Sequence, residues 1–248
     1  SAEIAANGDT HYDDHSDIAR GYLELQPAEV NRLVNRADEE GLVMHFHAIG
    51  DRAVSLALDA IELARSERDS QLPHNISHLQ LVQSEDVSRF GELGAFATPT
   101  PSWFTPWQAY DQSVIPYILQ VENIYDVNDL YREDSEYMRD VYPAESIRSA
   151  GGMLSFGSDA PVDFQGPRPF TNMVGAFLRA DWVAQNALND ESEWQWVVMN
   201  PAERLSMKDV LDAYTINGAK AMRHQQETGS LEVGKQADFI IVNNDLLA

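Results

Sequence analysis

Residues 44–52 constrain the fold most, because they join the end of a buried strand to the start of a helix through a histidine. The apolar run 42–46 ends at His47, and the turn residues Gly50 and Asp51 open a strongly amphipathic helix. A strand followed at once by a helix is the repeating unit of an α/β fold, in which functional side chains gather at the carboxyl ends of the strands. The sequence therefore predicts that His47 lies at such a site.

The same unit is repeated along the chain. The hydrophobic pattern predicts strands at 42–47, 74–79, 95–98 and 152–157, and helices at 27–40, 51–64, 84–93 and 144–150. Four alternations of strand and helix predict an α/β fold with a parallel sheet, and four such units make half of an eight-stranded barrel. Further helices are predicted at 170–188 and 206–222, and a last strand at 237–242.

Composition narrows the possible partners and the compartment. The chain has 248 residues, of which 44% are hydrophobic, a net charge of -23 and no cysteine. An acidic surface repels phosphate groups, which argues against nucleic acid or an anionic membrane as a partner. No apolar run is long enough to cross a membrane, and residues 1–9 lack the basic start and apolar core of a signal peptide, so we expect a cytoplasmic protein.

Three polar residues are predicted to share one place in this fold. His47, His78 and Asp159 lie at or near the carboxyl ends of predicted buried strands, which converge on one cavity in a parallel barrel. Imidazole and carboxylate are the ligands typical of a catalytic zinc centre. Each residue alone also has an ordinary explanation, since a strand histidine is often a hydrogen-bonded core residue and an aspartate before Pro161 is often a turn residue.

Other polar segments are predicted to be less direct participants. His45 precedes His47 by two residues, so it should lie one layer deeper in the barrel, as a core residue or a support for a ligand. His74 should be structural at the start of its strand. Residues 1–26 contain a cluster of histidines and aspartates that we interpret as a solvated loop rather than a metal site. The aromatic and acidic segment 102–143 is predicted to be a functional loop over the site.

Four motifs closely resemble the third family of the amidohydrolase superfamily, in the branch that includes N-substituted formamide deformylase. They lie at 47–53, at 78–90, at 157–162 and at 229–238, in the right order, and the resemblance extends over about 21–242. Their residues are His-Ala-Ile-Gly-Asp-Arg-Ala; His-Leu-Gln-Leu-Val with Glu85-Asp86 and Arg89-Phe90; Gly-Ser-Asp-Ala-Pro-Val; and Gly-Ser-Leu-Glu-Val-Gly-Lys-Gln-Ala-Asp.

The resemblance implies a (β/α)8 barrel with a metal centre at its carboxyl face. His47 would be the metal ligand of strand five, His78 the histidine of strand six, and Asp159 the strand-eight aspartate that binds metal and handles the proton. Zinc is the metal that this resemblance favours. His78 and Asp159 would be the catalytic residues in hydrolysis of a carbon–nitrogen bond of a small amide-type substrate by a metal-activated water.

The chain lacks two parts of the family's pattern, namely a His-x-His pair on strand one and a bridging lysine or glutamate on strand four. We therefore expect residues 1–224 to be the C-terminal half of the barrel and 225–248 to begin a small β-sandwich domain. A bare half barrel would expose a long apolar face and open edges, so we expect cover by the missing half, by a second copy, or by rearrangement into a compact domain. The alternatives are a non-catalytic binding or assembly module that keeps the fold, or a cyclic amidine deaminase.

Overall fold

The computed structural model describes residues 23–107, 110–111, 131–132, 134–161, 167–180 and 198–247. Most of the predicted N-terminal His/Asp loop, much of the loop 102–143 and the end of the predicted helix 170–188 lie outside the described residues.

The centre of the fold is a parallel sheet of four strands in the order β1-β2-β3-β4. These strands are His45–Ala48, Asn75–His78, Phe96–Thr98 and Met153–Leu154. The connecting segments contain α2 (Asp51–Glu67), α3 (Ser84–Val87) with α4 (Arg89–Leu93), and α8 (Ala144–Ser149), while α1 (Pro27–Glu39) precedes the sheet. All four predicted strand–helix units are therefore present.

Local sequence signals explain where several helices begin and end. Pro27 opens α1, where its missing N–H costs nothing, and Gly41 follows the helix at a φ of 71° that suits glycine. Ser206 accepts a hydrogen bond from the Asp209 N–H at the start of α11 (Met207–Tyr214). Asp51 is the first residue of α2, and its carboxylate accepts hydrogen bonds from the Arg52 N–H and from Gln83.

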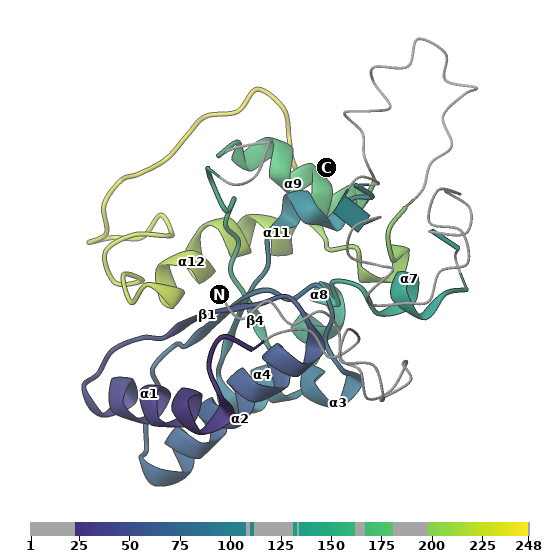
Figure 1. The fold of residues 1–248 in the computed structure, drawn as a ribbon. Helices are drawn as coiled ribbons and strands as arrows, with labels where there is room; N and C mark the ends of the chain where they lie inside the picture. The colour runs from purple at the N-terminus through teal and green to yellow at the C-terminus, as the bar shows by residue number, and fades with distance from the viewer. Residues whose placement is uncertain are drawn as a thin grey trace.

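The remaining elements form a second group in the later part of the chain. They are η1 (Pro101–Phe104), α7 (Glu136–Asp140), α9 (Pro169–Leu178), η3 (Pro201–Glu203), α11 and α12 (Ile216–Ala221). The predicted helix 206–222 is thus broken, at Thr215. Figure 1 shows α1 to α4 on one side of the strands and α9, α11 and α12 on the other.

The predicted strand 237–242 does not form. The segment has no strand hydrogen bonding, and it finds no partner strand among the described residues. Its apolar side chains Phe239, Ile240 and Ile241 are 64%, 73% and 89% exposed. Figure 1 shows this C-terminal segment as a yellow arc that stands clear of the helices. Assignment of 225–248 to a sandwich domain remains a prediction.

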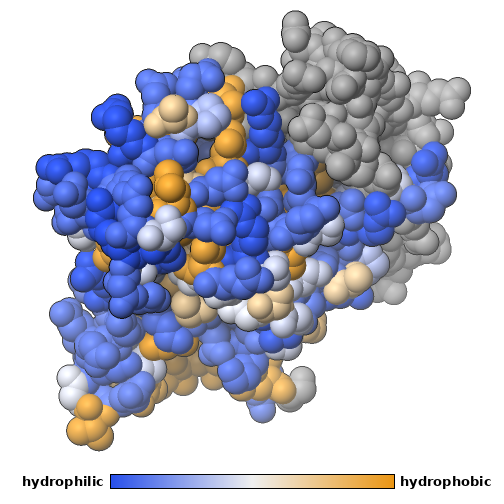
Figure 2. Space-filling model, turned by 90° about the horizontal axis from the view of Figure 1, so that it is seen from below, coloured by the Kyte–Doolittle hydropathy of each residue, from blue (hydrophilic) through white to orange (hydrophobic). Residues whose placement is uncertain are grey.

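The two faces of the sheet differ in chemistry. Ala48, Ile76 and Leu154 belong to the apolar core together with the inner side of α2. The opposite face carries polar side chains that contact one another, since Ser77 Oγ lies 2.5 Å from His45 Nε2 and Thr98 donates to Asn75 over 3.1 Å. This face also carries apolar side chains, because Phe96 pairs in register with Asn75 and Met153 pairs with Phe96, so it is mixed rather than uniformly apolar. Figure 2 shows the helix-covered side of the molecule, which is mainly hydrophilic.

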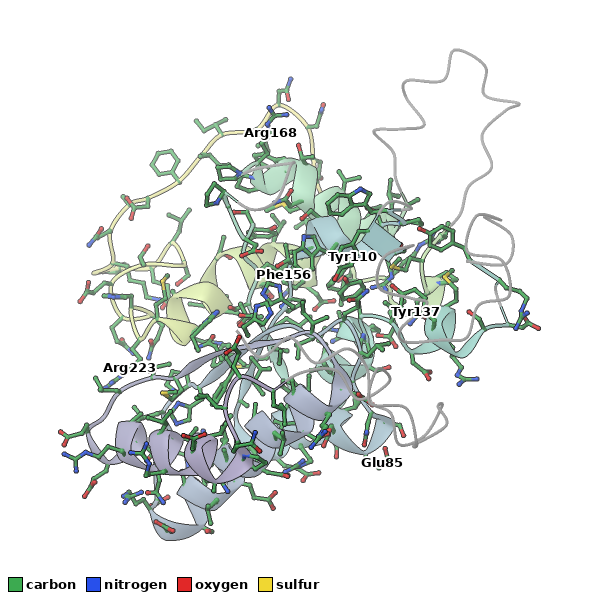
Figure 3. The ribbon with its side chains drawn as sticks, in the orientation of Figure 1. Glu85, Tyr110, Tyr137, Phe156, Arg168 and Arg223 are labelled. Carbon is green, nitrogen blue, oxygen red and sulfur yellow. The ribbon has the colours of Figure 1, made fainter. Side chains whose placement is uncertain are left out.

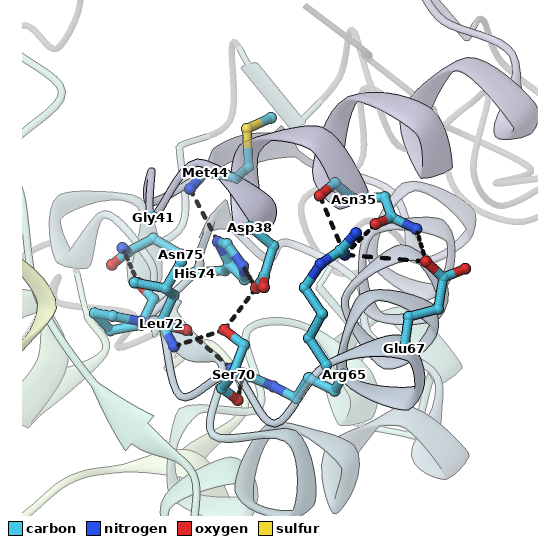
Figure 4. A network of polar contacts seen from close by, with 12 residues as sticks. Asn35, Asp38, Gly41, Met44, Arg65, Glu67, Ser70, Leu72, His74 and Asn75 are labelled. Carbon is cyan, nitrogen blue, oxygen red and sulfur yellow. Dashed lines mark hydrogen bonds and ion pairs between the residues drawn. The ribbon is translucent and has the colours of Figure 1, made fainter.

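A buried polar network ties α1 to the start of β2 (Figure 4). His74 is fully buried, its Nδ1 accepts from the Met44 N–H over 3.0 Å, and its Nε2 lies 3.0 Å from Asp38 Oδ2. Burial opposes ionisation of Asp38, but hydrogen bonds from Ser70 and His74 hold the pKa of its carboxyl below the ordinary value. This arrangement fits the structural role predicted for His74. The two hydrogen bonds place the imidazole proton on Nε2 and connect α1 to the start of β2.

Candidate metal centre

The structure brings His47 and His78 together at the carboxyl end of the sheet. Their ring centroids lie 4.4 Å apart with the planes at 65°. The register pairs His78 with Ala48, so simple alternation would direct its ring to the helix side. The backbone is left-handed at His78 (φ 71°) and Leu79 (φ 55°), which turns the chain at the strand end. Such conformations cost about 1–3 kcal/mol at non-glycine residues and are found at functional sites.

The surroundings of His78 keep its imidazole neutral. Burial first, then the neighbouring His47 and His45, lower the pKa of His78 to about 4. Its Nδ1 finds no hydrogen-bond partner in the described part of the chain, although the side chain is only 6% exposed. A neutral imidazole with an unused buried nitrogen is the form that binds a divalent metal. The two histidines therefore fit a metal centre as part of a ligand set.

Asp159 does not complete that set in this structure. It follows β4 in a left-handed conformation, with φ at 52°, and is partly exposed. Among the described residues, no three histidine, aspartate or glutamate side chains form a group that could hold a metal ion. The structure thus joins two of the three predicted ligands, and the assignment of Asp159 stays a prediction.

His45 lies in a different environment from the one expected. His45 is exposed, so the prediction that it is a core residue is wrong. Its Nε2 contacts the buried Ser77 hydroxyl, and it contributes to the low pKa of His78. A role in support of the neighbouring histidines remains compatible with these contacts.

Sequence reasoning missed a polar network behind His78. Gln80 is fully buried; its amide donates to the Tyr137 hydroxyl over 2.9 Å and accepts from Tyr110 over 3.0 Å. Tyr131 donates to Asp111 over 2.6 Å, and burial raises the pKa of Asp111 to about 6. The available signal was the position of Gln80, two residues after His78 in the same motif.

Other motif residues hold elements together. Arg89 donates to Asp86 over 2.7 Å, to Asp59 over 2.8 Å and to Glu62 over 2.7 Å, which joins α4 to α2. Ser55 of α2 also donates to Asp86. This part of the second motif therefore stabilises the packing of helices against one another. None of these hydrogen bonds involves His47 or His78.

Comparison with known proteins decides the family, because the model of the amidohydrolase family matches residues 2–248. The chain belongs to the amidohydrolase family. This finding confirms the predicted superfamily and its third family. The match extends over almost the entire chain, so it includes the strands that carry His47 and His78.

Individual relatives of this amidohydrolase are distant in sequence. It is 27% identical over 98% of its length to Protein LONG AFTER FAR-RED 3 of Arabidopsis thaliana, and it covers 37% of that protein. It is 23% identical over 88% of its length to N-substituted formamide deformylase of Arthrobacter pascens, covering 34% of that protein. The chain therefore spans little more than a third of the length of these relatives.

Solved structures agree on the fold. An uncharacterized metal-dependent hydrolase from Pyrococcus horikoshii superposes with a TM-score of 0.68 at 22% identity, over 100% of this chain and 41% of that one. A second, from Pyrococcus furiosus, gives a TM-score of 0.66 at 24% identity, over 92% and 39%. The partial barrel is thereby confirmed.

No described helix of the amidohydrolase is long and apolar enough to cross a membrane.

Proposed function

We propose that this chain supplies part of the active site of a metal-dependent amidohydrolase that cleaves a non-peptide carbon–nitrogen bond of a small molecule. The observation that carries the proposal is the contact between His47 and His78 at the strand ends, with His78 neutral and its Nδ1 without a hydrogen-bond partner in the described ranges. Family membership supports the same chemistry.

The residues would divide the work as follows. His47 and His78 would hold a divalent ion, for which zinc is our choice, through neutral imidazoles. When bound, the ion would supply Lewis-acid activation of a water and of the substrate carbonyl. Asp159 would accept the proton of the attacking water at its carboxylate and return it to the departing nitrogen, so that the amide gives a carboxylic acid and an amine.

A second body should complete the site. Two histidines are fewer than the three protein ligands of most catalytic zinc sites. The outer edges of β1 and β4 have no strand partner among the described residues, and His45 of β1 is exposed. We propose that another polypeptide segment, either the remainder of a longer enzyme or a second copy, pairs with these edges and brings the other ligands.

Metal binding tests the proposal directly. We expect the purified chain to bind zinc in calorimetry, and His47→Ala and His78→Ala each to weaken binding at least tenfold. Asp159→Ala should weaken it less, because that carboxylate is not yet grouped with the histidines. His224→Ala, which changes an exposed histidine, is the matched control. A variant without His11 and His15 excludes binding by the N-terminal cluster. Equal binding by all variants would remove the basis of the proposal.

Two alternatives lead to different outcomes. A non-catalytic module is favoured by the incomplete ligand group, and it predicts that no zinc binds at His47 and His78. A deaminase is suggested by a relative, 5-methylthioadenosine/S-adenosylhomocysteine deaminase of Thermoanaerobacter pseudethanolicus, which is 24% identical over 92% of this chain. Release of ammonia from a cyclic amidine, instead of a carboxylate from an amide, would favour it.

A further inference from the structure

A row of aromatic rings extends from His78 toward the surface. The Trp103 ring, presented by η1, stacks on His78 with centroids 4.7 Å apart and planes at 15°. Tyr110 lies 5.9 Å from Trp103 and 5.6 Å from Trp107, between these two rings. Trp107 is 40% exposed, whereas His78 is 6% exposed. The row thus connects the candidate metal centre with solvent.

Hydrogen bonds behind the row fix its position. Tyr110 is bound to Gln80, Gln80 to Tyr137, and Tyr137 to Asp111 over 3.3 Å. Asp111 also accepts from the Trp107 N–H over 3.2 Å, so both outer rings are attached to one buried network. In Figure 3, Tyr110 and Tyr137 lie near each other on the same side of Phe156. Rings held in this way are preorganised, which lowers the entropy cost of binding a ligand.

The inner end of the row contains two buried polar atoms that no described residue hydrogen-bonds. Trp103 Nε1–H and His78 Nδ1 are both buried, and neither has a hydrogen-bond partner among the described residues. A buried polar group without a partner costs about 1–3 kcal/mol, and such groups are rare in folded proteins. The His78 nitrogen is explained by the proposed metal. The indole N–H of Trp103 is a donor only, so the partner that it lacks must be a hydrogen-bond acceptor.

We propose that Trp103 orients the substrate: its indole N–H donates to an oxygen of the substrate, and the row of rings packs against a planar, uncharged group of the same molecule. This inference rests on the proposed function, because it deepens the same site. A cation is a poor fit, since the ring faces are already stacked on one another at 15° and 21°. The ring edges that remain carry partial positive charge and pack well on an aromatic face.

The test uses the whole chain without metal and the probe acetanilide, a neutral planar amide. With ¹⁵N-labelled tryptophan, the indole N–H signal of Trp103, assigned from Trp103→Phe, should move downfield and saturate. Trp103→Phe keeps a ring but loses the donor, so it should bind acetanilide about fivefold more weakly, equivalent to one neutral hydrogen bond. Phe239→Leu, at a position that is 64% exposed and outside the row, is the control and should leave the affinity within twofold.

A second probe tests the planar group. N-cyclohexylacetamide has the same amide but a puckered ring, and we expect about fivefold weaker binding. Equal affinity for both probes, an unmoved Trp103 signal, or equal weakening by Trp103→Phe and Phe239→Leu would overturn the inference. Zinc binding is measured separately, so the two proposals fail separately. Zinc binding without a shift of the Trp103 signal would contradict only the proposed role of Trp103. A shift without zinc binding would contradict only the proposal of a metal-dependent hydrolase.

Discussion

At the scale of single residues, the buried histidines His74 and His78 differ in the hydrogen-bond partners of their ring nitrogens. Within the described part of the chain, His78 Nδ1 has no hydrogen-bond partner, whereas both nitrogens of His74 have partners in Met44 and Asp38. Motif and strand position alone do not separate the two residues, because both lie at strand ends. The hydrogen-bond inventory separates a structural histidine from a candidate ligand.

His74→Ala should lower the free energy of unfolding by about 2–4 kcal/mol, because it leaves the Asp38 carboxylate and the Met44 N–H buried without their partner. Urea unfolding followed by circular dichroism measures the change. His224→Ala, at an exposed ion pair, should change stability by less than about 0.5 kcal/mol. Equal effects of the two substitutions would show that the Asp38 network contributes little.

Asp111 should give the protein a pH-dependent stability of unusual sign. Its pKa rises from 3.8 to about 6 on folding, mainly through burial, so the native state binds more protons between these values. The stabilisation is complete below about pH 4 and is lost as the pH rises through about 6, a change of about 3 kcal/mol.

The measurement is the difference in unfolding free energy between the wild type and Asp111→Asn, taken at about pH 4 and about pH 7. We expect the difference to move by about 3 kcal/mol in favour of the variant at the higher pH. Asp134→Asn, whose side chain is 79% exposed, should show no such movement. A constant difference for Asp111→Asn would refute the shifted pKa.

At the scale of elements, Gln80 links the end of β2 to α7 and to the aromatic row. Gln80→Met keeps the size of the side chain but leaves the Tyr110 and Tyr137 hydroxyls without this partner. We expect a loss of about 1–3 kcal/mol in thermal unfolding and weaker acetanilide binding. Gln236→Met, at an exposed position, is the control. Unchanged binding in a destabilised Gln80 variant would separate the network from the row.

The exposed C-terminal segment should contribute almost nothing to folding. Replacing Phe239, Ile240 and Ile241 together by serine should change the unfolding free energy by less than about 1 kcal/mol, because water already surrounds these side chains. Leu58→Ala, at a position with 0% exposure, should cost about 2–5 kcal/mol. Denaturant titration of both variants checks the contrast, and a large loss in the serine variant would mean that the segment packs in solution.

Much of this element pattern follows from local sequence. The helices at 27–39 and 144–149 were predicted within a residue or two of their observed ends, because Pro27 and the glycines after them act locally. The prediction of a strand at 237–242 was wrong, since a strand needs a partner strand, which the hydrophobic pattern of one segment does not reveal. The turn of His78 toward His47 depends on a left-handed backbone at a non-glycine residue, which sequence patterns do not show.

At the scale of the whole molecule, the net charge of -23 should make stability depend on salt. Raising sodium chloride from about 0.02 M to about 0.5 M shortens the screening length severalfold and weakens repulsion among carboxylates. We expect the melting temperature at neutral pH to rise, as measured by scanning calorimetry. At about pH 4 the rise should be smaller, because many carboxylates are then protonated. An equal rise at both pH values would point to a cause other than charge.

The paired polar side chains on one face of the sheet affect how the proposed additional segment would join it. Ser77 is bonded to His45, and Asn75 accepts a hydrogen bond from Thr98, so these groups have partners before any association. A segment that pairs with the edges of β1 and β4 would therefore meet side chains whose polar atoms need no new partner. Where that segment belongs to another chain, we expect pairing to be a bimolecular step whose rate depends on concentration.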